Sequence, residues 1–286
     1  MLDKIAFGEL TRHSADKQIF ISDQNGIFMH TRPEQHFSDR REINFSNGNH
    51  AQALLVPVGA QVDGMASVLG IQAPGNVILI AGGASAMGKE SDNELFPLLM
   101  NGIVHPATSL NALILDGGTQ TGVMALIGLG VAQQQHRPTL LGVAADGMVL
   151  YPGKTTGTNE HAVPLDPNHS HFILVETATW GKETRTMYEL VQFLSRGHTS
   201  VAVLVNGGEI ARKEALYNVH QGRPLIIIEG SGRAADEIAR AMHDATFASS
   251  NAELTEILVK GDLHLFPISG PAKELEQLML KLLERK

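Results

Sequence analysis

The sequence contains no cysteine and one tryptophan, and aromatic residues make up only 5% of it. Without cysteine there is no disulfide, no thiolate metal site and no cysteine nucleophile, so any catalysis must use oxygen or imidazole groups. No apolar run is long enough to span a bilayer, and the start, Met1-Leu2-Asp3-Lys4, lacks the order of a secretory signal. These absences predict a cytoplasmic protein without membrane insertion.

Positive charge is also scarce, which excludes a further class of partner. The formal net charge is -8 at pH 7, and no cluster of lysine and arginine reverses it locally, so a nucleic acid would be repelled. A small anionic ligand stays compatible with this charge, because backbone N–H groups and helix N-termini can hold phosphate in an acidic protein.

From residue 53 onward the sequence shows short, continuous apolar runs, which are typical of strands covered on both faces of a parallel sheet. The predicted strands are 53–58, 77–81, 112–116, 140–145, 172–176, 201–205, 225–229 and 263–267. Segments with helical spacing are 94–104, 122–132, 183–194, 210–219, 233–243 and 273–283. Strands and helices alternate, which predicts an α/β fold: a Rossmann-like parallel sheet with helices on both faces.

The first fifty residues differ from the rest. They are polar and contain one hairpin signal, in which residues 18–22 and 27–31 flank the turn pair Asn25-Gly26. We therefore predict an N-terminal appendage with a small β-hairpin at 1–50 and a nucleotide-ligand-binding domain at 51–286. The amphipathic last helix packs on the core or on a partner, which leaves a homo-oligomer open.

Several predicted strands end in glycine where the chain turns into a helix. In a parallel sheet such loops lie at one edge, where α/β proteins bind ligands. Glycine lets the backbone approach a phosphate, and the following helix directs its free N–H groups at the charge. A single loop of this kind can equally serve only as a tight turn. The four loops are Gly82-Gly83-Ala84-Ser85, Gly117-Gly118-Thr119-Gln120-Thr121-Gly122, Asn206-Gly207-Gly208-Glu209 and Gly230-Ser231-Gly232-Arg233.

Two named nucleotide motifs nearly fit these loops. The stretch from Gly83 to Lys89 matches a P-loop, but Glu90 replaces the Ser or Thr that would hold Mg²⁺. Gly230-Ser231-Gly232-Arg233-Ala234-Ala235 matches the dinucleotide fingerprint, but the next strand does not end in the acid that binds a ribose. A P-loop NTPase and a dehydrogenase are both disfavoured.

The glycine loops, taken in order, resemble a known family. The motifs that carry the likeness are Gly82-Gly83-Ala84, Asp116-Gly117-Gly118-Thr119-Gln120-Thr121-Gly122-Val123-Met124, Leu165-Asp166-Pro167-Asn168-His169-Ser170-His171-Phe172-Ile173-Leu174-Val175 and Gly230-Ser231-Gly232-Arg233-Ala234-Ala235-Asp236. They resemble the SLOG superfamily, and within it the LSDAT branch of TRPM channels and their prokaryotic relatives, from about Ala53 to about Arg240.

The resemblance implies a Rossmann-like sheet that recognises a nucleotide-derived ligand, such as ADP-ribose or an NAD-derived messenger, with no other cofactor required. By this analogy the phosphate contacts fall to Gly83, Gly118, Thr119, Thr121 and Gly122. The residues that complete the pocket are Gly207, Gly208, Gly230, Ser231, Gly232 and Arg233. Channel relatives carry an acidic residue and then Gly-Thr after the His-containing strand, whereas this chain has Glu176-Thr177-Ala178-Thr179.

A more distant likeness is to the phosphoribohydrolases that release cytokinin bases. Their signature places Gly-Gly, then Gly-Thr, then a glutamate, and this chain has Gly207-Gly208 and Glu214 without the Gly-Thr pair. Glu209 or Glu214 could stabilise an oxocarbenium-like ribosyl centre. The alternative is that Glu209 is a helix-dipole partner and Glu214 a solvated helix residue.

Other side chains also have two interpretations. Arg233 either contacts a phosphate or pairs with an acid on its own helix. Glu176 either binds ribose hydroxyls or caps a neighbouring helix. His169 and His171 lack a third metal ligand, which favours hydrogen bonding and predicts no metal site. Trp180 either stacks on a base or covers the sheet edge.

Three functions follow from the sequence. The first is a sensor for an ADP-ribose-like, NAD-derived or cyclic nucleotide ligand, which passes its signal through assembly or an effector protein. The second is a nucleotide N-glycosidase or phosphoribohydrolase that uses Glu209 or Glu214. The third is a structural or assembly domain with a vestigial pocket.

Overall fold

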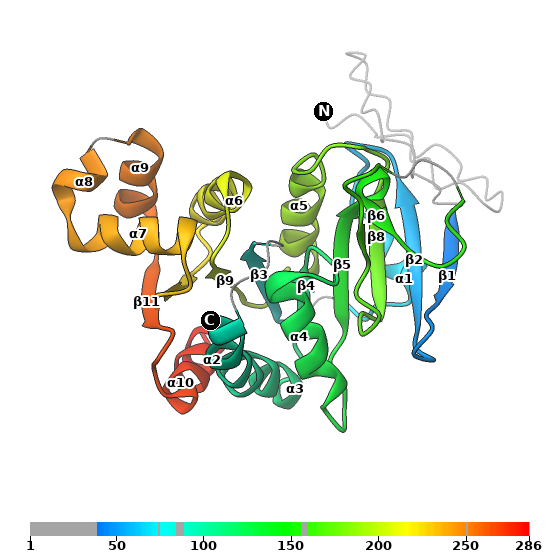
Figure 1. Cartoon of the computed structure of the whole chain (residues 1–286), viewed down its shortest axis with the longest axis horizontal. Helices are drawn as coiled ribbons and strands as arrows, with labels where there is room; N and C mark the ends of the chain where they lie inside the picture. The colour runs from blue at the N-terminus through cyan, green and yellow to red at the C-terminus, as the bar shows by residue number, and fades with distance from the viewer. Residues whose placement is uncertain (1–38, 74, 84–88, 156–158, 250, 286) are drawn as a thin grey trace, which may run out of the picture. The chain divides into compact units, whose positions relative to one another are not determined.

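The computed structural model describes residues 39–285 apart from 74, 84–88, 156–158 and 250. Within this part a nine-stranded sheet has the order β1-β2-β8-β5-β4-β3-β9-β10-β11. All neighbours are parallel except β1 and β2. The predicted α/β class with a largely parallel sheet is therefore confirmed (Figure 1).

The elements agree closely with the predicted runs. The strands are β1 (Arg40–Asn44), β2 (His50–Val56), β3 (Val77–Gly82), β4 (Leu113–Asp116), β5 (Leu140–Ala145), β6 (Val149–Leu150), β7 (Val163–Pro164), β8 (His171–Val175), β9 (Ser200–Val205), β10 (Leu225–Glu229) and β11 (Leu263–Pro267). The helices are α1 (Met65–Leu69), α2 (Lys89–Leu99), η1 (Met100–Val104), α3 (His105–Ser109), α4 (Gly122–Ala132), η2 (Asp146–Met148), α5 (Thr184–Leu194), α6 (Glu209–His220), α7 (Arg233–His243), α8 (Ala245–Ser249), α9 (Ala252–Lys260) and α10 (Ala272–Leu283).

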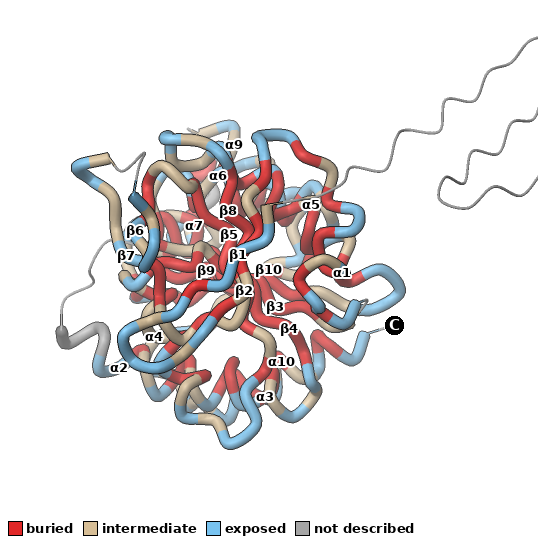
Figure 2. Tube along the Cα trace, turned by 90° about the vertical axis from the view of Figure 1, so that its right-hand side faces the viewer, coloured by how far each residue is buried: buried red, intermediate tan, exposed pale blue. Residues whose placement is uncertain are grey.

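The sheet is buried on both faces because its strands carry apolar side chains at consecutive positions. In β3, Val77 and Leu79 belong to the core beneath α1, α5, α6 and α7, whereas Ile78 and Ile80 belong to the opposite core beneath α2, α3, α4 and α10. This division follows from the two-residue period of a strand. The central strands are consequently buried, and exposed residues gather on the surrounding helices and loops (Figure 2).

The order of the strands creates a switch in winding. After β3 the chain adds β4, β5 and β8 on one side, and it then crosses to add β9, β10 and β11 on the other. β3 and β9 are therefore neighbours whose connections leave in opposite directions. In open α/β sheets this is where a crevice forms at the carboxyl ends of the strands.

The two ends of the chain carried separate predictions. The predicted hairpin around Asn25-Gly26 lies outside the described residues, and a different hairpin, β1-β2, forms one edge of the sheet. The apolar face of α10 is buried against the chain's own core through Leu275, Met279 and Leu282. Of the two places predicted for this helix, the structure shows the core.

A close contact between β5 and the loop after β4 generates a stability prediction. A Cβ on Gly142 would lie 2.6 Å from the Cα atom of Gly118 and 2.8 Å from the ring of Phe172. Gly142→Ala should lower the free energy of unfolding by about 1–3 kcal/mol, because the added methyl group overpacks a closed site.

Urea unfolding measures this change. Gly75→Ala is the matched control, since nothing lies within 4 Å of its Cβ position, and it should stay within about 0.5 kcal/mol of the wild type. Equal stability of the two variants would contradict the close packing of this loop on β5.

Candidate functional site

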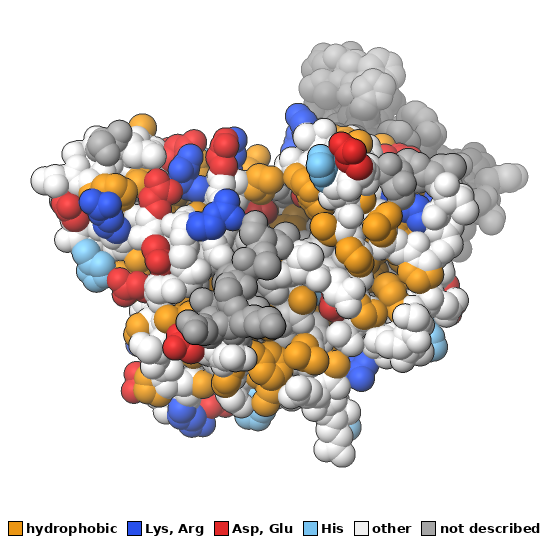
Figure 3. Space-filling view, viewed as in Figure 1, with side chains coloured by type: hydrophobic (Ala, Val, Ile, Leu, Met, Phe, Trp, Pro, Cys, Tyr) orange, Lys and Arg blue, Asp and Glu red, His pale blue; other side chains and the backbone are white. Residues whose placement is uncertain are grey.

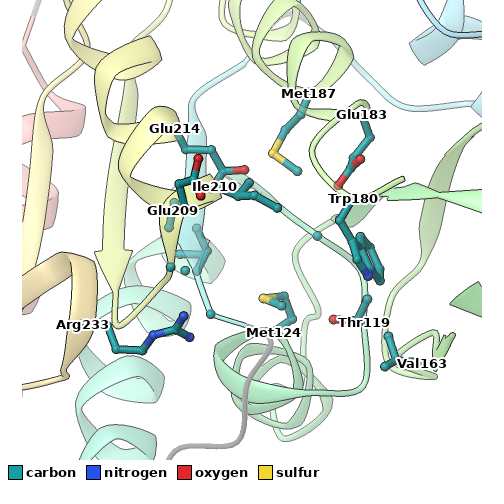
Figure 4. Close-up of a pocket in the computed structure, with 16 residues that line it drawn as sticks. Thr119, Met124, Val163, Trp180, Glu183, Met187, Glu209, Ile210, Glu214 and Arg233 are labelled. Carbon is teal, nitrogen blue, oxygen red and sulfur yellow. The ribbon is translucent and has the colours of Figure 1, made fainter. Parts of the chain in front are cut away.

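The carboxyl ends of β3, β4 and β9 surround a cavity of about 560 Å³. Its position is the switch in winding, because its walls come from the loops that follow these strands and from the start of α6 (Figure 4). In the space-filling view this face is notched between α6 and α5, with hydrophobic side chains along the notch (Figure 3). The lining residues are Ile80, Gly82, Gly83, Gly117, Thr119, Met124, Val163, Trp180, Glu183, Met187, Gly208, Glu209, Ile210, Ala211, Glu214 and Arg233.

Glycine backbones form the floor of the cavity. A Cβ on Gly83 would stand 3.2 Å from the amide nitrogen of Gly207. Gly207 itself has φ +89°, a conformation that L side chains rarely adopt. The loops after β3 and β9 therefore meet through bare main chain, and Gly208 then begins α6 as its N-cap.

The loop after β10 supports the site more than it lines it. The N–H groups of Ala234 and Ala235 donate to the carbonyls of Gly207 and Asn206 at 3.1 and 3.0 Å. The buried hydroxyl of Ser231 accepts the N–H of Asn206 at 2.7 Å and donates to a β10 carbonyl at 2.6 Å. The first amides of α7 thus hold the neighbouring loop in place and do not face a ligand.

Arg233 is the member of this loop that reaches the cavity. Its guanidinium lies over Gly208, with Nη2 2.7 Å from the point where a Cβ would be. A larger residue at Gly208 would displace this group. The position brings a positive charge next to the N-terminus of α6, where the helix dipole also favours an anion.

A buried ionic network holds the loop after β4. The N–H of Gly118 donates to Asp116 at 2.6 Å, and His169 bridges Asp116 and Asp166 at 2.9 and 3.1 Å. Burial alone lowers the pKa of His169, but the two carboxylates outweigh it and raise that pKa to about 9. The imidazole is therefore protonated at neutral pH, and both of its nitrogens are engaged within the protein.

The opposite end of the cavity carries two buried carboxyls. Glu183, the N-cap of α5, is 7% exposed, and Glu214, on α6, is 8% exposed. Burial and, to a smaller extent, the carboxylate of Glu183 together raise the pKa of Glu214 to about 8. Burial also raises the pKa of Glu183. Ionising both acids in one apolar site would cost much free energy, so the pair keeps one proton near neutral pH.

Glu209 behaves differently from these two acids although it lines the same cavity. Its carboxylate is 70% exposed and pairs with Lys213 at 2.8 Å. The hydrogen bond to Lys213 lowers the pKa of Glu209. It stays ionised at the start of α6, which matches the dipole-partner interpretation of this residue.

The structure brings most of the predicted loops to one edge but separates their residues into two groups. The predicted residues that line the cavity are Gly82, Gly83, Gly117, Thr119, Gly208, Glu209, Glu214 and Arg233. The predicted residues outside its lining are Gly118, Gln120, Thr121, Gly122, Glu176, Asn206, Gly207, Gly230, Ser231 and Gly232. Ala84 and Ser85 lie outside the described residues.

Sequence reasoning did not single out Glu183, Met124, Met187 or Ile210, which also line the cavity. The one available signal for Glu183 was its place as the first residue of the predicted helix 183–194, and an acid there is ordinary. Glu214 was predicted, but its alternative as a solvated residue is wrong, because the side chain is buried.

Comparisons with known proteins decide the family. A family model described as "SLOG in TRPM, prokaryote" matches residues 75–276. The chain belongs to this family. The SLOG domain is also similar to the transient receptor potential cation channel subfamily M member 2 of Mus musculus, with 30% identity over 69% of the chain and 15% of the channel.

Other relatives show the same pattern. The member-like 2 channel of Nematostella vectensis is 30% identical over 60% of the chain and 13% of its own length. Member 4 of Rattus norvegicus is 26% identical over 76% of the chain and 20% of its length. The SLOG domain thus spans no more than a fifth of these channels. Among the described residues, no helix has the length and apolar character needed to cross a membrane.

The raised pKa of Glu214 generates a pH prediction. Its ordinary value of 4.5 applies to the unfolded chain, whereas the folded value is about 8. The folded state therefore binds the proton more tightly, and the stability from this proton is lost as pH rises from 4.5 to 8. Glu214→Gln removes this loss, by up to about 1.4 kcal/mol for each pH unit.

Urea unfolding of wild type and Glu214→Gln between pH 5 and pH 9 measures the difference. The variant should gain stability relative to wild type as pH rises, and the gain should level off above pH 8. Titration of other groups, including His169, is shared by the two proteins and cancels. A difference independent of pH would show that Glu214 is ionised throughout.

Proposed function

We propose that this SLOG domain is a sensor that binds a nucleotide-derived ligand, either ADP-ribose-like, NAD-derived or a cyclic nucleotide. The observation that carries the proposal is the meeting of three glycine-rich strand ends, the N-terminus of α6 and Arg233 at one cavity. Main-chain amides and a guanidinium are suitable partners for phosphate in a chain of net charge -8.

The rest of the cavity fits the remainder of such a ligand. Trp180, Met124, Met187 and Ile210 provide an aromatic and apolar wall. A nucleobase stacks on surfaces of this kind. As a sensor the domain works in the cytoplasm and passes its signal through a second copy or an effector protein. Its likeness covers only part of the cation channels, so the proposal includes no channel activity.

The binding prediction uses Arg233. Calorimetry with ADP-ribose, NAD and AMP should detect a complex with at least one of them. Arg233→Ala should weaken this complex by about 10- to 100-fold, because a hydrogen bond to a charged group contributes about 1.5–3 kcal/mol. Arg240→Ala, on the same helix but outside the cavity, is the control and should bind as the wild type does.

The absence of binding by the wild type at high micromolar concentration would reject the sensor. That result would favour the third alternative, a structural domain with a vestigial pocket. An equal loss in both arginine variants would show that the effect comes from α7 as a whole and not from a contact in the cavity.

The buried acids favour one second candidate, a nucleotide N-glycosidase. Glu214 with a raised pKa can donate its proton to a departing base, while the carboxylate of Glu183 takes a proton from the water that attacks the ribosyl carbon. The bond between this carbon and the base nitrogen breaks as the new carbon–oxygen bond forms. Glu209, exposed and paired with Lys213, is the weaker choice for this chemistry.

Chromatography of AMP incubated with the protein tests the enzyme. A freed base should appear, and Glu214→Ala should slow its release by at least about 100-fold. Glu189→Ala, an exposed acid on α5 paired with Arg185, should leave the rate unchanged. Release that persists in both Glu183→Ala and Glu214→Ala would remove this mechanism.

A further inference from the structure

The cavity has two chemically different ends. At one end lie Gly83, Gly208 and the guanidinium of Arg233, and at the other lie Glu183 and Glu214. Glu214 follows Gly208 by six residues in α6, which separates the two ends by about 9 Å along the helix axis. In the close-up the two acids are in the upper half and Arg233 is at the lower left (Figure 4).

At the acidic end one buried carboxyl oxygen is left without a donor among the described residues. Oε2 of Glu183 is buried and has no hydrogen-bond partner within the described part of the chain. A buried acceptor without a donor is costly, and a donor group on a ligand would remove that cost. Glu214 lines the same end and adds further acceptor positions.

A ribose presents the donors that this end requires. Its 2′- and 3′-hydroxyls are adjacent, and the two oxygens of a carboxylate can accept hydrogen bonds from such hydroxyls. A ribose 5′-phosphate places its anion and its hydroxyls at opposite sides of one unit, in the same way as the cavity places its amides and its acids. A phosphate on the 2′-hydroxyl would instead meet the acid pair, whose remaining negative charge repels it strongly in a desolvated site.

We propose that Glu183 and Glu214 determine specificity by binding the free ribose hydroxyls of the ligand and rejecting a ligand that carries a second phosphate there. This inference rests on the proposed function, because it assumes that the phosphate lies on the glycine loops. It adds which end of a nucleotide each part of the cavity contacts. Neither acid is required to act on the ligand chemically.

A mononucleotide is the cleanest probe because it has a single ribose. Calorimetry at pH 7 compares AMP with adenosine 2′,5′-bisphosphate for the wild type, for Glu183→Gln and for the double variant Glu183→Gln/Glu214→Gln. The wild type should bind AMP at least tenfold more tightly than the bisphosphate. In the double variant this preference should fall below threefold, since the amides keep the shape and remove the charge.

Glu189→Gln serves as the control, because Glu189 is an acid on α5 that pairs with Arg185 outside the cavity. It should keep the wild-type preference. Urea unfolding of each variant establishes that it is folded, so that a loss of preference can be assigned to the site.

The possible outcomes distinguish a failure of this inference from a failure of the proposed sensor function. Equal binding of the two nucleotides by the wild type, or failure of AMP to bind a protein that binds ADP-ribose, would overturn the assignment and leave the sensor in place. A preference unchanged in the double variant would also overturn it. A wild type that binds no nucleotide at all would reject both.

Discussion

The approach of the Gly83 and Gly207 backbones is the constraint on which the site depends. β3 and β9 are neighbours at the switch in winding, where a Cβ on Gly82 would clash with the carbonyl of Val205 and a Cβ on Gly83 would press on the amide nitrogen of Gly207. Because glycine stands at both positions, the main chain of two separate crossovers meets on one floor, with α6 beginning above it. The strand order and the glycine residues therefore form the cavity, and the side chains that line it are placed around this floor.

Polar groups around this floor are divided between support and recognition. Ser231, Asn206 and the first amides of α7 bond to one another and to neighbouring carbonyls, so they give the floor its shape. His169 does the same from below the loop after β4. Arg233, Glu183 and Glu214 remain at the walls, where a bound molecule would meet them.

The sequence predicted the sheet and the edge at which the cavity lies because both depend on local patterns. Continuous apolar runs identify strands with two buried faces, and glycine after a strand identifies a loop at the carboxyl edge. The role of Gly118 was harder to predict, because its packing against Gly142 depends on the register of β4 and β5. Glu183 could not be found in this way, since only the tertiary fold brings it opposite Glu214.

The network beneath the loop after β4 has an electrical consequence for whatever enters the cavity. Two aspartates and one imidazolium sum to one negative charge, sealed under Gly118 where water cannot screen it. Arg233 carries a positive charge at the wall formed by Gly208, so the two charges give the cavity an electric field of fixed direction.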